Sequence, residues 1–206
     1  TAALTEEQAK HILGAQANLW TEYIATTEHA EYMILPRMAA LAEVQWTQPE
    51  QKDYADFTQR LPRLIKFYQR DSMNYAKHIF DIQAEYTTTQ EEDGSGSGAI
   101  VATLRTIDNA PIYYTLDGTE PTTASEQYNG TGIVIRQSAD LRAVAIRPEG
   151  KSKVTEKSFY INKATFCPIE LTGTQPTPKY AFKGATALVD GMSGIDNYAT
   201  GEWIGF

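Results

Sequence analysis

Cysteine, runs of basic residues and long apolar stretches are scarce in this sequence, and each shortage excludes a class of protein. A single cysteine, Cys167, excludes an internal disulfide framework in the 206 residues. Lys and Arg are scattered and the formal net charge is −8, so we expect no nucleic-acid partner and no anionic membrane partner. No apolar run approaches the roughly 20 residues of a membrane helix, and the opening TAALTEEQAKHILG does not have the layout of a signal peptide.

The composition is that of a soluble globular protein, with 42% hydrophobic and 21% charged residues. It changes near residue 85. Helix-favouring Ala, Leu, Glu, Gln and Arg dominate before this point, whereas Thr, Val, Ile, Tyr and Gly, which favour strands and turns, dominate after it. We therefore predict a domain boundary there.

The first part of the chain contains signals for a short helix and a buried strand. Thr5 and Gln8 have the spacing of a capping box at a helix start. The segment 12–20, ILGAQANLW, is apolar and small without strict alternation, which is typical of a strand buried on both faces.

Two longer helices are predicted between the buried strand and residue 70. One begins near Pro36, because proline suits the first helical turn, and runs towards Trp46. The other follows Pro49, where apolar residues recur at three- and four-residue spacing and give one apolar face. Pro62 lies within this pattern and predicts a kink or a break.

The second part of the chain reads as short strands separated by turn residues, the pattern of an all-β sandwich. Ile100, Ala102 and Leu104 alternate with Val101, Thr103 and Arg105, and Ile112, Tyr114 and Leu116 are predicted to share a face. The stretch 166–206 is more loop-like. The predicted strands cover residues 78–89, 99–107, 111–118, 132–136, 141–147 and 153–161.

The most informative place for function is Trp20-Thr21-Glu22, directly after the predicted buried strand. In β/α barrels, functional residues lie at the carboxyl ends of strands. An indole covers the apolar C–H face of a pyranose, and a neighbouring carboxylate accepts hydrogen bonds from its hydroxyls. The alternative is structural: Trp20 belongs to the core, and Glu22 caps a helix or pairs with Arg37.

Other residues that can carry chemistry have less support. The three histidines show no metal-ligand spacing, and Gly94, Gly96 and Gly98 precede a strand rather than a helix, so we predict no metal site and no phosphate loop. Cys167 reads as a structural thiol. Asn129-Gly130-Thr131 matches a glycosylation sequon, and Asp117 with Glu120 favours a turn over a calcium site. The histidines are His11, His29 and His78.

Residues 5–60 resemble the end of the catalytic barrel of glycoside hydrolase family 20, the β-N-acetylhexosaminidases. The resemblance is carried by LGAQANLWTEY and EYMILPRMAALAEVQW. IYYTLDGTEPT and LRAVAIRPEGKSKV, within residues 85–162, resemble the immunoglobulin-like domain appended to many of these enzymes. ALVDGMSGIDNYATGEWIGF resembles the opening of a discoidin-type carbohydrate-binding domain.

The resemblance implies a fold and a mechanism. The fold is the end of a (β/α)8 barrel over 1–84, an immunoglobulin- or fibronectin-III-like sandwich over 85–165 and a truncated discoidin-like start over 166–206. The family hydrolyses terminal N-acetylhexosamines with retention, and the nucleophile is the substrate's own acetamido oxygen. An Asp-Glu pair in a Gly-Asp-Glu motif assists, and this motif is absent here.

By the same resemblance, Trp20 forms a wall of the pocket for the non-reducing sugar and Glu22 grips its 4- and 6-hydroxyls. Both are substrate-binding residues, and we expect no catalytic residue, metal or cofactor in this chain. Arg37, Glu43 and Trp46 match positions that read as structural. We expect the catalytic pair to lie upstream and the chain by itself to be inactive.

Two further functions remain open for the second part of the chain: a carbohydrate-binding module and a spacer. The spacer is favoured because two facing sheets explain the apolar residues. Tyr113, Tyr128 and Tyr160 are the residues that would support glycan binding. From the family, we expect a bacterial protein acting on N-acetylhexosamine-containing glycans in the periplasm, at the cell surface or outside the cell.

Overall fold

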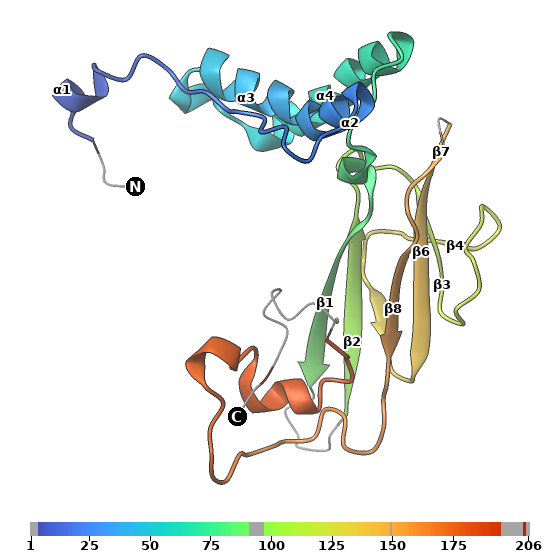
Figure 1. Ribbon diagram of the computed structural model, residues 1–206. Coiled ribbons are helices and arrows are strands. Elements are labelled where there is room, and N and C mark those ends of the chain that lie inside the picture. Colours follow the sequence, from blue (N-terminus) through green and yellow to red (C-terminus); the bar gives the residue numbers. More distant parts are fainter. Residues whose placement is uncertain (1–3, 91–96, 149, 195–203, 205–206) are drawn as a thin grey trace. The chain divides into compact units, whose positions relative to one another are not determined.

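The computed structural model describes residues 4–90, 97–148, 150–194 and 204. The chain divides into two compact units, residues 1–79, here called the helical unit, and residues 80–206, the β-rich unit (Figure 1). The predicted limits at 84/85 and 165/166 stay predictions. In the described ranges, no helix is long and apolar enough to cross a membrane.

The helical unit contains the predicted helices and three that were not predicted, namely α2 and the short 3-10 helices η1 and η2. The Thr5 and Gln8 capping box is confirmed, because the Gln8 side chain accepts from the Thr5 amide at 2.9 Å. The helix near Pro36 is also confirmed. α2 was missed; Thr26 caps its start. The helices are α1 (Glu6–Ala9), α2 (Thr27–Ile34), α3 (Arg37–Trp46), η1 (Pro49–Gln51), α4 (Tyr54–Arg70) and η2 (Lys77–Phe80), which ends in the β-rich unit.

The predicted strand over residues 12–20 does not form. This segment has no regular structure, and most of its side chains are exposed. A strand exists only through its ladder of hydrogen bonds with a neighbour, and no described residue of the helical unit forms such a ladder with it. The end of a barrel is therefore not confirmed by the structure.

Pro62 does not break α4, which runs from Tyr54 to Arg70. The predicted apolar face is present: Leu61, Ile65 and Tyr68 are buried. Asp53 caps the helix start, since its carboxylate accepts from the amides of Ala55 and Asp56 at 2.8 and 3.1 Å. Pro62 has no backbone N–H and so removes one hydrogen bond from the helix. The packed face and the cap stabilise α4 despite this loss.

The β-rich unit consists of two antiparallel sheets. One is three-stranded with the order β1-β2-β5. The other has the order β4-β3-β6-β7, and β8 pairs with β6. The strands are β1 (Gln83–Gln90), β2 (Gly98–Arg105), β3 (Ile112–Thr115), β4 (Glu126–Gln127), β5 (Ile133–Ile135), β6 (Ala139–Arg147), β7 (Gly150–Lys151) and β8 (Thr155–Phe159), followed by the short helices η3 (Pro178–Tyr180) and η4 (Gly184–Leu188).

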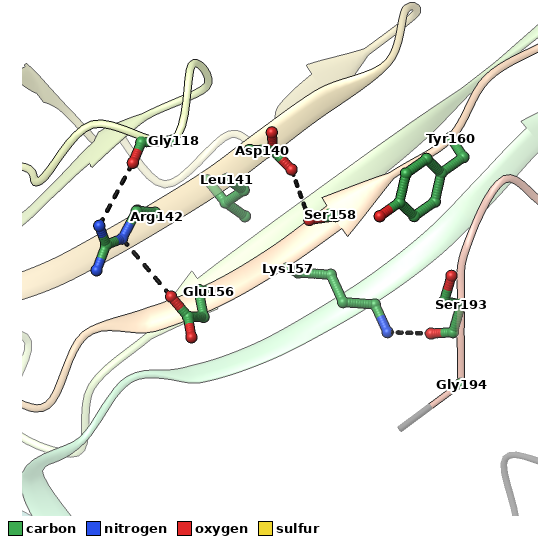
Figure 2. A pocket seen from close by; sticks show the side chains of 10 residues that line it. All are labelled: Gly118, Asp140, Leu141, Arg142, Glu156, Lys157, Ser158, Tyr160, Ser193 and Gly194. Atoms are coloured by element: carbon green, nitrogen blue, oxygen red, sulfur yellow. Dashed lines mark hydrogen bonds and ion pairs between the residues drawn. The ribbon is translucent and has the colours of Figure 1, made fainter. Parts of the chain in front are cut away.

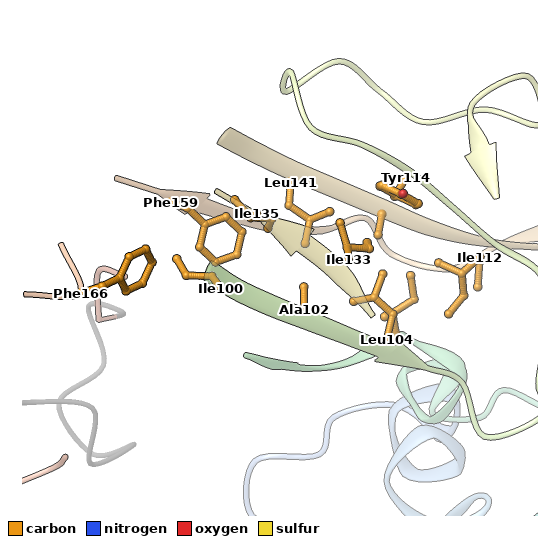
Figure 3. Close-up of a cluster of buried hydrophobic side chains, with 13 residues drawn as sticks. Ile100, Ala102, Leu104, Ile112, Tyr114, Ile133, Ile135, Leu141, Phe159 and Phe166 are labelled. Atoms are coloured by element: carbon orange, nitrogen blue, oxygen red, sulfur yellow. The ribbon is translucent and has the colours of Figure 1, made fainter. Parts of the chain in front are cut away.

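One hydrophobic core fills the space between the two sheets (Figure 3). Ile100, Ala102 and Leu104 of β2 point into it, as their alternation predicted. Across the core, Tyr86 of β1 meets Phe159 of β8 edge to face, with ring centroids 5.5 Å apart. Two sheets around a shared core are compatible with a β-sandwich.

Most predicted strands are present, with three differences. The strand predicted over residues 78–89 begins only at Gln83 (β1), because Lys77–Phe80 form η2. Ile112 and Tyr114 are buried as predicted, but Leu116 is exposed because β3 ends at Thr115 and the chain turns at Gly118, which has a positive φ. The two-residue strands β4 and β7 carry no hydrophobic alternation and were not predicted.

The segment after β8 packs on the end of the sheets. Phe166 lies in the hydrophobic core, and a Cβ on Gly98 would approach its ring to 2.7 Å, so glycine makes room for it. The amides of Tyr160 and Phe166 donate to the carbonyls of Gly191 and Val189, each at 2.8 Å. Residues up to Met192 thus contribute to the β-rich unit.

An ion pair between Arg147 and Asp108 connects β6 to the beginning of the β-rich unit at Phe80. The Arg147 guanidinium donates to both carboxylate oxygens of Asp108 at 2.7 Å and to the Phe80 carbonyl at 2.9 Å, and both charged side chains are largely buried. Burial by itself raises the pKa of Asp108. The hydrogen bonds and positive charge of Arg147 outweigh this effect, so the pKa lies below its usual value.

Candidate functional site

Trp20 and Glu22 lie on an exposed stretch that leads into α2. The Ile24 amide donates to the Thr21 carbonyl at 3.0 Å and closes a turn through Glu22. The Trp20 side chain is 74% exposed, and Glu22 is exposed too. Trp20 is therefore not a core residue of the described part of the chain. An exposed indole and a carboxylate two residues apart are available to a ligand.

Two side chains of α3 bond to the backbone elsewhere in the unit, one in the segment before this stretch and one at the far end of α2. The Gln45 side-chain amide of α3 donates to the Ala15 carbonyl, in the segment before Trp20. Arg37 donates to the carbonyls of Tyr32 and Met33, at 3.1 and 2.8 Å, at the end of α2. Arg37 is therefore a helix-capping residue, and no described residue forms an ion pair with Glu22.

Glu43 joins two helices of the same unit. Its Oε1 accepts from Arg60 of α4 at 2.6 Å, and Arg60 also pairs with Asp56. The hydrogen bond from Arg60 holds the pKa of Glu43 below its usual value. This agrees with the structural role expected for Glu43. Trp46 is 87% exposed in this structure.

A second candidate site is an open pocket of about 710 Å³ on β6 and β8 (Figure 2). Asp140 and Ser158 are direct cross-strand neighbours, and the Ser158 hydroxyl donates to the Asp140 carboxylate at 2.5 Å. Arg142 and Glu156 form the next pair on the same face, with their charged atoms 3.7 Å apart. Tyr160 follows on this face after β8 ends.

Of the pocket residues, the sequence pointed only to Tyr160. Asp140 and Arg142 on β6, and Glu156 and Ser158 on β8, occupy alternate positions, so each pair lies on one face of its strand. This period-two pattern of charged residues was present in the sequence. It identifies a face only when the pairing register of the two strands is known.

The three tyrosines that would support glycan binding differ in exposure. Tyr160 is 59% exposed, whereas Tyr113 and Tyr128 are only partly exposed. Tyr128 packs against the hydrophobic core, and its hydroxyl is buried without a hydrogen-bond partner among the described residues. Only Tyr160, of the three, presents most of its ring to a ligand.

The remaining candidates have local structural roles. The Asp117 carboxylate accepts hydrogen bonds from the amide and the hydroxyl of Thr119, which form the turn predicted for this position. These bonds lower the pKa of Asp117. The Asn129 side chain makes the same turn with Thr131. Cys167 donates to the Lys163 carbonyl.

The described residues contain no group of three or more potential metal ligands. The His78 ring lies 3.3 Å from the Tyr32 hydroxyl. Gly94 and Gly96 of the rejected phosphate loop lie outside the described residues, as does most of the discoidin-like end after residue 194.

Two family models match separate parts of the chain. Residues 1–49 match the catalytic domain of glycosyl hydrolase family 20. Residues 102–159 match the family described as Fn3 associated. The first match contains Trp20 and Glu22, and the second covers β3 to β8 and half of β2.

Three curated proteins are similar to this chain. A β-hexosaminidase of Porphyromonas gingivalis (strain ATCC BAA-308 / W83) is 30% identical over 206 residues, 97% of this chain and 25% of that protein. A β-N-acetylhexosaminidase of Cellulomonas fimi is 39% identical over 59 residues, 29% of this chain and 12% of that protein. A β-hexosaminidase of Vibrio vulnificus is 49% identical over 45 residues, 22% of this chain and 5% of that protein. The chain therefore spans about a quarter or less of these relatives.

Proposed function

We propose that this chain, which belongs to glycosyl hydrolase family 20, is part of an exo-acting β-N-acetylhexosaminidase and supplies sugar-binding residues to it. The observation that carries this proposal is the exposed Trp20–Glu22 stretch inside the segment that matches the family's catalytic domain. The three relatives, all named as hexosaminidases, support the same activity.

Trp20 and Glu22 bind the terminal sugar in this proposal. The indole packs on the apolar C–H face of the pyranose, which requires an exposed ring on a fixed backbone. The Glu22 carboxylate accepts hydrogen bonds from the 4- and 6-hydroxyls, and such charge-assisted bonds are stronger than neutral ones. Neither side chain transfers a proton to the reacting atoms.

The chemical step follows the substrate-assisted route that the family resemblance implies. The acetamido oxygen of the substrate attacks the anomeric carbon, a Glu protonates the leaving oxygen, and an Asp orients the acetamido group. Water then opens the intermediate with the same Glu as base, which retains the configuration. No Gly-Asp-Glu motif occurs in these residues, so the Asp-Glu pair comes from polypeptide outside this sequence.

The β-rich unit has an immunoglobulin- or fibronectin-III-like sandwich as its core in this proposal, with a spacer as its main role. The Fn3-associated match and the sheet orders, β1-β2-β5 and β4-β3-β6 with β8, support the sandwich fold. The domain limits 85–165 and 166–206, with a discoidin-like start in the latter, are part of the same proposal. The protein acts in the periplasm, at the cell surface or outside the cell.

The substitution Glu22→Gln tests this function in an enzyme that contains this chain together with the catalytic Asp-Glu pair. The lost charge-assisted hydrogen bonds contribute about 1.5–3 kcal/mol, so kcat/KM on an aryl N-acetylglucosaminide should fall roughly ten- to a hundredfold. Glu50→Gln is the matched control, because Glu50 is also exposed but lies in η1. Unchanged kinetics in Glu22→Gln would remove Glu22 from the site.

A further inference from the structure

We propose that the open pocket on β6 and β8 is a second saccharide-binding subsite, which takes a neutral, hydroxyl-rich sugar unit on the ring of Tyr160. The choice of ligand rests on the proposed function, because an enzyme that removes terminal sugars remains close to the rest of the glycan. The volume of about 710 Å³ lies within the roughly 300–1,000 Å³ of small-molecule sites.

Tyr160 offers an exposed ring on a fixed backbone. Its amide donates to the Gly191 carbonyl at 2.8 Å, and its carbonyl accepts from the Thr165 hydroxyl at 3.5 Å. The side chain nevertheless remains 59% exposed at the rim of the pocket (Figure 2). A tyrosine ring has an apolar face for sugar C–H groups and a hydroxyl that remains in water, so it suits a pyranose.

Two polar groups of the pocket are held in place before any ligand arrives. The Asp140 carboxylate accepts from Ser158 at 2.5 Å, and the Lys157 ammonium donates to the Ser193 carbonyl at 2.5 Å. The Asp140 carboxylate retains further acceptor capacity, and Lys157 retains two donors. Sugar hydroxyls need both kinds of partner, because each hydroxyl donates and accepts.

The charges that line the pocket balance one another. Asp140 and Glu156 carry negative charges and Arg142 a positive one on the same face. Lys157 adds a second positive charge from the opposite face of β8, where its ammonium lies over the Tyr86 ring. A pocket with excess positive charge would favour phosphate or sulfate, and one with excess negative charge would favour a cation. The balance favours a ligand that is neutral but rich in hydrogen-bonding groups.

Arg142 provides a donor that is not satisfied within the described chain. Its Nε is buried and has no hydrogen-bond partner. The Glu156 carboxylate lies 3.7 Å away, too far for a hydrogen bond, and its side chain is 73% exposed and free to rotate. A sugar hydroxyl that displaces this carboxylate would satisfy the Arg142 donor, which is costly to leave unpaired.

Titration of the full chain with N-acetylglucosamine and with its β1,4-linked dimer tests the subsite, followed residue by residue by NMR. The amides of Gly118, Ser158 and Gly194 should shift with one common dissociation constant. Tyr160→Ala should weaken binding about tenfold, and Tyr160→Phe by no more than about threefold, because stacking depends on the ring. Tyr180→Ala is the control, since this exposed tyrosine lies outside the pocket.

Three results would overturn the subsite. These are no shift around Tyr160 at tens of millimolar sugar, equal weakening by Tyr160→Ala and Tyr180→Ala, and shifts confined to the indole N–H of Trp20. The last result leaves the proposed function intact. Shifts around Tyr160 that Tyr160→Ala abolishes support the subsite whatever the kinetics of Glu22→Gln show, so the two proposals fail separately.

Discussion

The helical unit and the β-rich unit place their large apolar side chains differently. In the β-rich unit, Ile100, Leu141 and Phe159 are almost completely buried between two sheets. In the helical unit, Leu13 and Trp46 are almost fully exposed, and an apolar groove of about 590 Å³ lies between α3 and α4. The β-rich unit thus has a core between two sheets, whereas the described part of the helical unit buries one face of α4 together with Leu35, Tyr75 and Ala76.

This difference indicates which unit depends on further contacts. Isolated helices are marginal in water, and most helical stability in proteins comes from packing of an apolar face. The exposed apolar side chains of the helical unit therefore lack the contacts that would stabilise them. We expect the β-rich unit to dominate the measured stability of the chain, and three substitutions test this expectation.

The largest effect is expected from Phe159→Ala in the β-rich unit. Phe159 is 1% exposed and contacts Tyr86 across the core, so its truncation should lower the free energy of unfolding by about 3–5 kcal/mol. Leu13→Ala in the helical unit should change it by less than about 0.5 kcal/mol. Urea unfolding followed by near-ultraviolet circular dichroism measures both. Equal effects of the two substitutions would contradict the comparison.

A smaller effect is expected from Asp108→Asn. The change removes the negative charge of the largely buried ion pair with Arg147. It should lower the free energy of unfolding by about 2 kcal/mol at pH 7. Folding lowers the pKa of Asp108. The contribution of its carboxylate to the free energy of unfolding is therefore fully present above the pKa of about 4 in the unfolded chain, and it is lost as the pH falls through the pKa in the folded protein. The stability difference between wild type and Asp108→Asn should therefore shrink below about pH 4.

Urea unfolding at pH 7 and at pH 3 measures this difference. The other carboxylates are common to both proteins and cancel in the comparison. Glu85→Gln is the control, because its ion pair with Arg105 is exposed and should contribute less than about 1 kcal/mol. A difference that is the same at both pH values would mean that the Asp108–Arg147 pair does not have the described electrostatics.

Apart from the control substitutions, the smallest effect is expected in the helical unit, from Asp53→Ala. This substitution removes the cap of α4 and should destabilise the helix by about 1 kcal/mol. Amide hydrogen exchange should speed up at Ala55 and Asp56, whose amides lose their acceptor, and not in β2. Faster exchange in β2 as well would show that the two units unfold together.

Local signals in the sequence predicted much of the fold. The Thr5 capping box, the helix after Pro36 and the alternation of Ile100, Ala102 and Leu104 depend on neighbours a few residues away, and all are present. The strand over 12–20 was predicted from its apolar composition. A strand needs a partner strand, and no short-range pattern supplies one.

The candidate sites divide in the same way. Trp20 and Glu22 lie two residues apart in the sequence and could be identified from their spacing and a family resemblance. The pocket around Tyr160 could not, because the pairing of Asp140 with Ser158 depends on the register of two strands that are distant in sequence. The burial of Phe166 against Gly98 is likewise a contact between distant segments.

The most direct measurement is a crystal structure of an enzyme that contains this chain and the catalytic pair, bound to N-acetylglucosamine. We predict that the Trp20 indole packs on the apolar face of the sugar and that the Glu22 carboxylate lies about 2.5–2.7 Å from its 4- and 6-hydroxyls. An indole turned away from the sugar, with Glu22 beyond hydrogen-bond reach, would contradict the assignment of this stretch to the binding pocket.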